Sequence, residues 1–313
     1  MIKKVLFIVC LSALLGSCNN SKTPQYSDTS TSGEINIAVD ESLRPIIEAE
    51  KDVFVALYPE AKVNIIYTNE SEAINLLSKD SSRIAIVSRD LLPAERSSFE
   101  TRKIYPKSIV IGYDAIGIIM NPARKDTVLT IDQITKLLNG TYKTWKDLDT
   151  KNNGDGLRIV FDNTRSSAVR QLKDSLLKGA ALATHCYAVN GNPEVITQVE
   201  KDKNTIGIIG VSWISDKDDT TTNNFLNRVK VASLVPVNPA TAEAPVMKPY
   251  QAYIALKQYP LYRNIYIINP EGRYGLGTGF ASFINSDKGQ RIILKSGLVP
   301  AKAPVRIIQL NND

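Results

Sequence analysis

Residues 35–39 read INIAV, and this short apolar run opens the stretch of the chain that decides the fold. Two further runs suited to buried strands follow, KVNIIYT at 62–68 and RIAIVS at 83–88. Helical segments separate them, because Pro45 suits the first turn of one helix and residues 70–79 have the pattern of another. Strands that alternate with helices at this spacing predict an α/β fold with a largely parallel sheet.

The same alternation continues to the end of the chain. Pro93 opens a third helix, and SIVIGYDAIGIIMN at 108–121 forms a long β-rich run that we predict as two strand segments interrupted near Asp114. A second α/β set follows, with predicted helices at 130–140 and 166–178, strands at 157–162 and 205–210, and a helical stretch from 280 towards 295. Two such sets joined by long extended segments predict two lobes with a cleft between them.

The chain is predicted to cross from one lobe to the other twice. Residues 34–113 and 247–313 form lobe 1, and residues 114–246 form lobe 2. The two crossings are expected at 108–121 and at roughly 245–256. Proteins built in this way commonly close by hinge motion around a ligand.

The N-terminus has the pattern of an export signal. Lys3 and Lys4 precede an apolar run at 5–15 that is too short to span a bilayer. It ends in Leu-Gly-Ser-Cys, which resembles the lipobox of bacterial lipoproteins and implies cleavage before Cys18 with a lipid on its sulfur. We therefore expect a signal peptide at 1–17 and a location on the periplasmic side of a bacterial membrane.

A polar tether is expected to follow the lipid. Residues 18–33 are rich in serine and threonine, a composition typical of flexible linkers. Cys10 would leave with the signal and Cys18 would carry the lipid, so Cys186 remains alone and no internal disulfide is possible.

Composition excludes several classes of function. The formal charge is +6, but no basic run stands out, so nucleic-acid binding is unsupported. His185 is the only histidine, and no His, Asp or Cys cluster has metal-ligand spacing. We therefore expect no metal, no cofactor and no enzymatic activity, and we expect a monomer.

Candidate ligand contacts lie in the loops where strands give way to helices, because ligands of open α/β sheets bind beyond the carboxyl ends of the strands. Serines occupy three such loops, at 42, 71 and 166–167, where hydroxyls and free helix amides can donate to an anion. Arg165 adds a bidentate donor. Two simpler explanations stay open: the serines can be helix caps, and Arg89 and Arg165 can be ion-pair partners.

Three acids lie in the same loops and are unfavourable for an anion. One carboxylate is useful, since it can accept the proton of a partly protonated anion and repel a fully ionised one. We expect Asp40 to face the cleft in this role, Glu41 to face solvent, and Glu70 to be only a first-turn residue that favours the helix dipole. Three acids would repel an anion unless some of them point away or pair with Arg89 or with lysines. A protein that does not bind the anion, or an Arg165→Ala variant that binds it normally, would make a cationic or neutral ligand the better hypothesis.

Several segments together resemble a known family. They are, in chain order, 84–89 with 95, 114–122, 129–134, 139–140, 145–148, 206–210, 259–263, 289–290 and 297–300. Their order resembles the phosphate-binding component of bacterial phosphate ABC transporters, a type II periplasmic binding protein, in a divergent Bacteroidetes type of lipoprotein. The resemblance implies a binding protein that captures a small tetrahedral anion, phosphate first, for the permease of an ABC importer.

The loops depart from the family's usual pattern. Glycine-rich loops are replaced by Val-Asp-Glu-Ser-Leu at 39–43, Asn-Glu-Ser at 69–71 and Asn-Thr-Arg-Ser-Ser-Ala at 163–168, which keep hydroxyls and one arginine. The ligand contacts expected from these loops are Asp40, Ser42, Leu43, Ser71, Ser88, Arg89, Arg165, Ser166 and Ser167. Two other functions remain open: a sensor or interaction protein that uses the same fold without transport and, less favoured, a lipoprotein phosphatase.

Overall fold

The computed structural model describes residues 27–236 and 245–302. The predicted signal peptide, the lipidation site Cys18 and most of the predicted tether lie outside the described residues. At the end of the tether range, Asp28 is buried, pairs with Arg273 and accepts a hydrogen bond from the amide of Leu276 at 2.9 Å. The chain is therefore already packed against the folded body at Asp28.

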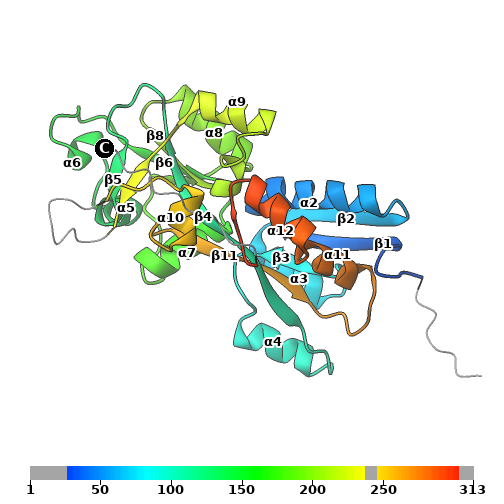
Figure 1. The fold of residues 1–313 in the computed structure, drawn as a ribbon. Coiled ribbons are helices and arrows are strands. Elements are labelled where there is room, and N and C mark those ends of the chain that lie inside the picture. Colours follow the sequence, from blue (N-terminus) through cyan, green and yellow to red (C-terminus); the bar gives the residue numbers. More distant parts are fainter. Residues whose placement is uncertain (1–26, 237–244, 303–313) are drawn as a thin grey trace, which may run out of the picture.

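The first lobe is a sheet covered by helices, seen on the right in Figure 1. Its central strand has one parallel neighbour on each side. The strands are β1 (Gly33–Asp40), β2 (Ala61–Thr68), β3 (Ala85–Val87) and β11 (Tyr262–Asn269), and the helices are η1 (Glu41–Leu43), α2 (Arg44–Leu57), α3 (Glu70–Ser78), α4 (Pro93–Glu100), α11 (Leu276–Ile284) and α12 (Asp287–Lys295). The central strand is β1, which explains its almost continuous apolar run, because both of its faces are covered.

The second lobe repeats this plan around β6, which pairs in parallel with β7 and β8. Its elements are β5 (Val128–Thr130), α5 (Ile131–Leu138), α6 (Trp145–Leu148), β6 (Arg158–Phe161), α7 (Ser167–Leu176), β7 (Cys186–Ala188), α8 (Asn192–Lys201), β8 (Thr205–Gly210), η2 (Val211–Trp213), α9 (Thr220–Arg228), β9 (Lys230–Val231) and β10 (Ser233–Val235). The strand–helix alternation predicted from the sequence is confirmed, and so is the α/β class.

One strand joins the two lobes. β4 (Lys107–Met120) pairs antiparallel with β11 up to Ala115 and with β8 from Ile116 onward. The predicted interruption near Asp114 is therefore wrong: the backbone stays extended and only the pairing partner changes. In Figure 1, β4 runs from one half of the molecule into the other.

The chain returns to the first lobe through α10 (Gln251–Ala255), after which β11 begins. The Gln251 side chain donates to the carbonyls of Leu294 and Leu298, which holds α10 against the end of α12. A short last strand, β12 (Val299–Pro300), also pairs with β4. The predicted helical stretch after residue 280 is two helices, since Ser286 caps a new helix after α11 ends.

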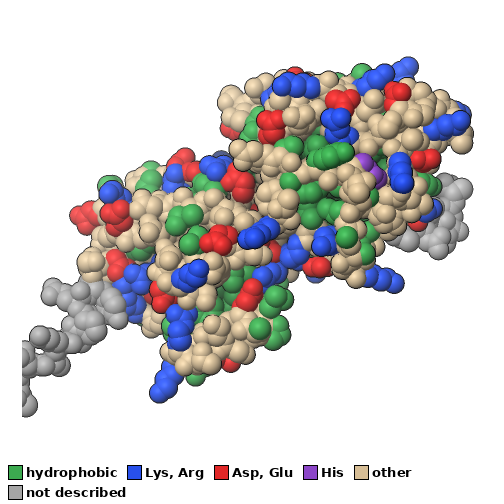
Figure 2. Space-filling view, turned by 180° about the vertical axis from the view of Figure 1, so that it is seen from behind, with side chains coloured by type: hydrophobic (Ala, Val, Ile, Leu, Met, Phe, Trp, Pro, Cys, Tyr) green, Lys and Arg blue, Asp and Glu red, His purple; other side chains and the backbone are tan. Residues whose placement is uncertain are grey.

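Figure 2 shows the molecule from the opposite side, with lysine and arginine interspersed with acidic side chains over the visible face. Within residues 27–236 and 245–302, no helix is long and apolar enough to cross a membrane.

Glu50 is a buried acid in the middle of α2. Its side chain is fully buried, and neither carboxylate oxygen has a hydrogen-bond partner within the described part of the chain. Burial raises the pKa of Glu50 to about 9, so the group is protonated at neutral pH. In the unfolded chain it ionises near its ordinary value of 4.5. Folding stability is therefore fully present below that value and is lost as the pH rises towards 9.

Glu50→Gln should remove this pH dependence. We expect the variant to match the wild type at pH 4.5 and to exceed its free energy of unfolding by about 4–5 kcal/mol at pH 8, because each pH unit between the two pKa values costs about 1.4 kcal/mol. Urea titrations at both pH values measure the difference. Glu100→Gln, at an exposed position on α4, is the control. An equal effect of Glu50→Gln at both pH values would contradict a buried neutral acid.

Candidate functional site

A buried ion pair lies where β4 passes between the lobes. Arg263, at the start of β11, donates from Nε and Nη2 to Asp114 Oδ2 at 2.9 and 2.6 Å. Arg263 is 4 % exposed and Asp114 is 0 % exposed. Burial opposes the charge of Arg263, but the negative charges of Asp114 and Asp40 outweigh it and raise the pKa of the guanidinium. The arginine is therefore a permanent cation at the junction of the lobes.

The remaining donors of Arg263 reach one serine from each lobe. Nη2 donates to Ser42 Oγ at 2.9 Å and Nη1 donates to Ser167 Oγ at 2.8 Å. The two hydroxyls lie 3.2 Å apart. Ser42 belongs to η1, directly after β1, and Ser167 begins α7, so both stand beyond the carboxyl end of a strand. A cation and two hydroxyls from opposite lobes thus meet at one point.

Ser212 holds the lobes together beside this point. Its hydroxyl donates to the carbonyl of Ser42 at 2.6 Å, and its amide donates to Asp114 Oδ1 at 3.2 Å. Gly210 permits the close approach, because a Cβ there would lie 2.9 Å from the Ser42 carbonyl oxygen and 3.0 Å from Arg263 Nη2. A side chain at position 210 would push the two lobes apart.

Two buried aspartates face the same region. Asp40 accepts the amide of Ser42 at Oδ1, while its Oδ2 has no hydrogen-bond partner among the described residues. Burial raises the pKa of Asp40, and the charge of Arg263 opposes the rise. Burial also raises the pKa of Asp162, to about 6, with the charge of Asp40 adding to the effect. The site therefore contains proton acceptors whose charge is costly unless a proton or donor reaches them.

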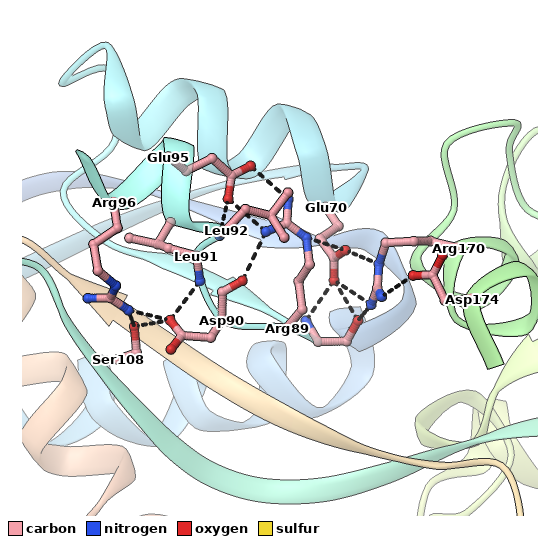
Figure 3. Close-up of polar contacts among 11 residues, drawn as sticks. Glu70, Arg89, Asp90, Leu91, Leu92, Glu95, Arg96, Ser108, Arg170 and Asp174 are labelled. Carbon is pink, nitrogen blue, oxygen red and sulfur yellow. Dashed lines mark hydrogen bonds and ion pairs between the residues drawn. The ribbon is translucent and has the colours of Figure 1, made fainter. Parts of the chain in front are cut away.

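Glu70 lies in the first turn of α3, as expected, and it also takes part in ion pairs. It is buried and accepts hydrogen bonds from the amide and hydroxyl of Ser88 at 3.1 and 2.6 Å. Arg170, on α7 of the other lobe, donates to it at 2.6 Å, and Arg89 Nε lies 3.2 Å away. Figure 3 shows these groups converging on the Glu70 carboxylate from both sides. Two arginines therefore neutralise this acid, which becomes a bridge between the lobes.

The other acid of the loops is also neutralised. Glu41 forms a bidentate ion pair with Arg44, whose guanidinium stacks 3.9 Å from the centre of the Tyr67 ring. These residues border a cleft of about 680 Å³ between the lobes, with Asp162 and Arg165 on its opposite wall. Glu41, which lines the cleft, lies in the chain between Asp40 and Ser42. These two belong with Asp114, Ser167 and Arg263 to a buried group that we call the interlobe cluster.

The structure places the predicted contacts in three groups. Asp40, Ser42 and Ser167 lie in the interlobe cluster; Leu43 and Ser166 are buried beside it, where Ser166 caps α7 through the amide of Ala168. Ser88 and Arg89 belong to the Glu70 bridge, and Arg89 also pairs with Glu95 at 2.7 Å. Ser71 and Arg165 are exposed. The assignment of all nine as ligand contacts stays a prediction.

Sequence reasoning missed the central cation. Arg263 and Asp114 lie in segments that carried the family resemblance, but neither received a role, because both occur inside strands rather than in strand-to-helix loops. Asp162, Arg170 and Ser212 were also missed. For Arg263 and Asp114 the sequence did hold a signal. A charged side chain inside a strand is costly to bury unless it is paired with an opposite charge.

The described residues contain no group of three or more His, Cys, Asp or Glu side chains that could hold a metal ion. The polar atoms of the interlobe cluster are instead hydroxyls, one guanidinium and carboxylates, which suit a ligand that both accepts and donates hydrogen bonds.

These features define a two-lobed α/β binding protein with its polar site between the lobes. A family model described as the PBP superfamily domain matches residues 24–288, and the chain belongs to that family. The chain is 27 % identical to the phosphate-binding protein PstS of Borreliella burgdorferi, over 96 % of this chain and 99 % of that protein. It is 23 % identical to the PstS of Pseudomonas aeruginosa PAO1, over 90 % and 88 %.

Solved structures show the same fold. A putative phosphate ABC transporter substrate-binding protein from Clostridium perfringens, with bound phosphate, aligns with a TM-score of 0.71 at 22 % identity, covering 86 % of this chain and all of that one. A phosphate transport receptor from Vibrio cholerae aligns with a TM-score of 0.63 at 21 % identity, with the same coverage. The expected type II periplasmic binding protein fold is confirmed.

The Arg263–Asp114 pair should be costly to break from one side. Arg263→Met leaves an unpaired buried carboxylate, so we expect a loss of about 3–5 kcal/mol in the free energy of unfolding. The double variant Arg263→Met/Asp114→Leu should recover most of that loss, because no uncompensated charge remains. Denaturant titration measures both. Arg291→Met, which breaks an exposed pair with Asp287, is the control and should cost about 0–1 kcal/mol. A double variant no more stable than the single one would contradict this account.

Proposed function

We propose that this protein captures inorganic phosphate between its lobes and delivers it to an ABC importer. The observation that carries the proposal is the meeting of the Arg263 guanidinium with one serine hydroxyl from each lobe, next to a carboxylate with a free oxygen. The likeness in sequence to proteins named phosphate-binding over nearly the whole chain supports it.

The charges around the interlobe cluster fit a partly protonated anion. Asp114 balances Arg263, and Arg89 and Arg170 balance Glu70, so these acids do not repel a ligand. Asp40 keeps one oxygen that can accept the proton of hydrogen phosphate. Sulfate carries no proton at neutral pH and would face that oxygen without a hydrogen bond, which supplies discrimination.

Hydroxyl donors complete the proposed site. Ser42 and Ser167 bond to each other and to Arg263, and an entering phosphate would take over these hydroxyls as donors to its oxygens. In this proposal Arg263, not Arg165, is the central cation, because Arg165 is exposed at the wall of the cleft. The titratable acids of the site among the described residues are carboxyl groups, which fits binding without turnover.

Asp40→Asn should change ligand selectivity. The amide can donate a hydrogen bond where the carboxylate could only accept one, so phosphate should bind about tenfold more weakly and sulfate should gain affinity. Titration calorimetry with both anions on the wild type and the variant tests this. Asp52→Asn, at an exposed position on α2, should bind like the wild type. A wild type that ignores phosphate would reject the function, and an unchanged phosphate-to-sulfate ratio in Asp40→Asn would reject the role of Asp40.

We also propose that the chain is a lipoprotein that faces the periplasm, anchored through Cys18. The support is the sequence Leu-Gly-Ser-Cys at 15–18 after a short apolar run with two lysines before it. Cys18→Ala should leave soluble or unprocessed protein. Membrane fractionation and the mass of the N-terminal peptide measure the result, and Cys186→Ala is the matched control. Unchanged fractionation and peptide mass in Cys18→Ala would contradict the anchor.

A further inference from the structure

A large hollow of the described structure shares no residue with the interlobe cluster. Its volume is about 930 Å³. One wall comes from the second lobe, through η2, α9 and β9, and the other from α10 and the end of α12. We call it the lysine groove. Sites that bind small organic ligands commonly have volumes of about 300–1,000 Å³, so the size suits a small molecule.

Cations dominate the rim of the lysine groove. Five lysines line it: Lys125, Lys217, Lys230, Lys248 and Lys295. All five are exposed, and none has a carboxylate within ion-pair distance in the described ranges. One carboxylate, that of Asp218, lies in the described lining. Concave surfaces lined by one sign of charge concentrate ligands of the opposite sign.

The floor of the same groove is apolar. Val211, Ile214, Leu226 and Val229 form it, and Tyr250, which is 53 % exposed, stacks with Tyr253 at one end. An inorganic anion would leave this apolar surface unused, and a neutral apolar molecule would leave the lysines unused. The combination fits a ligand with both parts.

We propose that the lysine groove binds an amphipathic organic anion, a small molecule that joins a carboxylate, phosphate or sulfonate to an apolar ring or chain. The acidic group would lie among the lysines and the apolar body would cover the floor. This inference does not rest on the phosphate-binding function, since it uses none of the residues of the interlobe cluster.

A ligand in the lysine groove would contact a segment that also contacts the interlobe cluster. Val211 and Ile214 line the groove, while Ser212, between them, bonds to the Ser42 carbonyl and to Asp114. One short 3-10 helix therefore contacts both places. Because the walls of the groove come from different parts of the two-lobed body, a bound molecule would also hold these parts in one arrangement.

The fluorescent sulfonate 8-anilinonaphthalene-1-sulfonate is a suitable probe, because it is flat, apolar and anionic. We expect one molecule to bind per folded chain at low salt, with a loss of at least about tenfold in affinity in 1 M NaCl, where screening shortens the range of charge interactions to about 3 Å. Saturating phosphate should not displace it. Displacement by phosphate would overturn the location, and binding of many molecules per chain would overturn a defined site.

Reversing the charge of two groove lysines tests whether the probe binds in the lysine groove. Lys248→Glu/Lys295→Glu should weaken binding of the probe by about tenfold or more, because two attractive charges become repulsive. The matched control is Lys79→Glu/Lys107→Glu, which makes the same charge change at exposed lysines outside the groove and should bind like the wild type. Equal affinity in both double variants would overturn the proposal. Circular dichroism and phosphate titration on the same samples show separately whether fold and phosphate site are intact.

Discussion

The buried ion pair between Arg263 and Asp114 is the constraint on which the rest of the structure depends. Two charges removed from water are tolerated only when their hydrogen bonds are satisfied. Here Asp114 is provided by the crossing strand β4, and the remaining donors of Arg263 require Ser42 from one lobe and Ser167 from the other. Satisfying one guanidinium therefore fixes the relative positions of β4, β11, η1 and α7.

The same constraint explains how a loop set rich in acids can serve an anion. Each acid except Asp40 and Asp162 has a basic partner: Glu41 has Arg44, Glu70 has Arg89 and Arg170, and Asp114 has Arg263. The two that remain are buried, and burial raises the pKa of both. In the proposed site both carboxyl groups favour a partner that brings a proton, and hydrogen phosphate is such a partner.

In the proposed site, loops without glycine still offer hydrogen-bond donors to an anion, but the donors are of another kind. Loops with glycine offer backbone amides to an anion, whereas Ser42 and Ser167 offer hydroxyls. The bridge between Glu70 and Arg170, drawn in Figure 3, adds a further contact between the lobes. A protein that must hold its lobes around a small ligand gains from such paired contacts, because each is broken when the lobes separate.

Sequence by itself determined the α/β class, the strands β1–β4, β6 and β8 with most of the helices between them, and the loops in which Asp40, Ser42 and Ser167 lie, because these follow from local periodicity and from the strand-to-helix positions of polar residues. It did not determine the ion-pair partners of the acids. Glu70 and Arg170 are 100 residues apart in the sequence, and Asp114 and Arg263 are 149 residues apart. Long-range pairs leave no local pattern. Only the tertiary structure decided that Arg263 is the central cation and that Arg165 is exposed, because burial depends on how the two lobes meet.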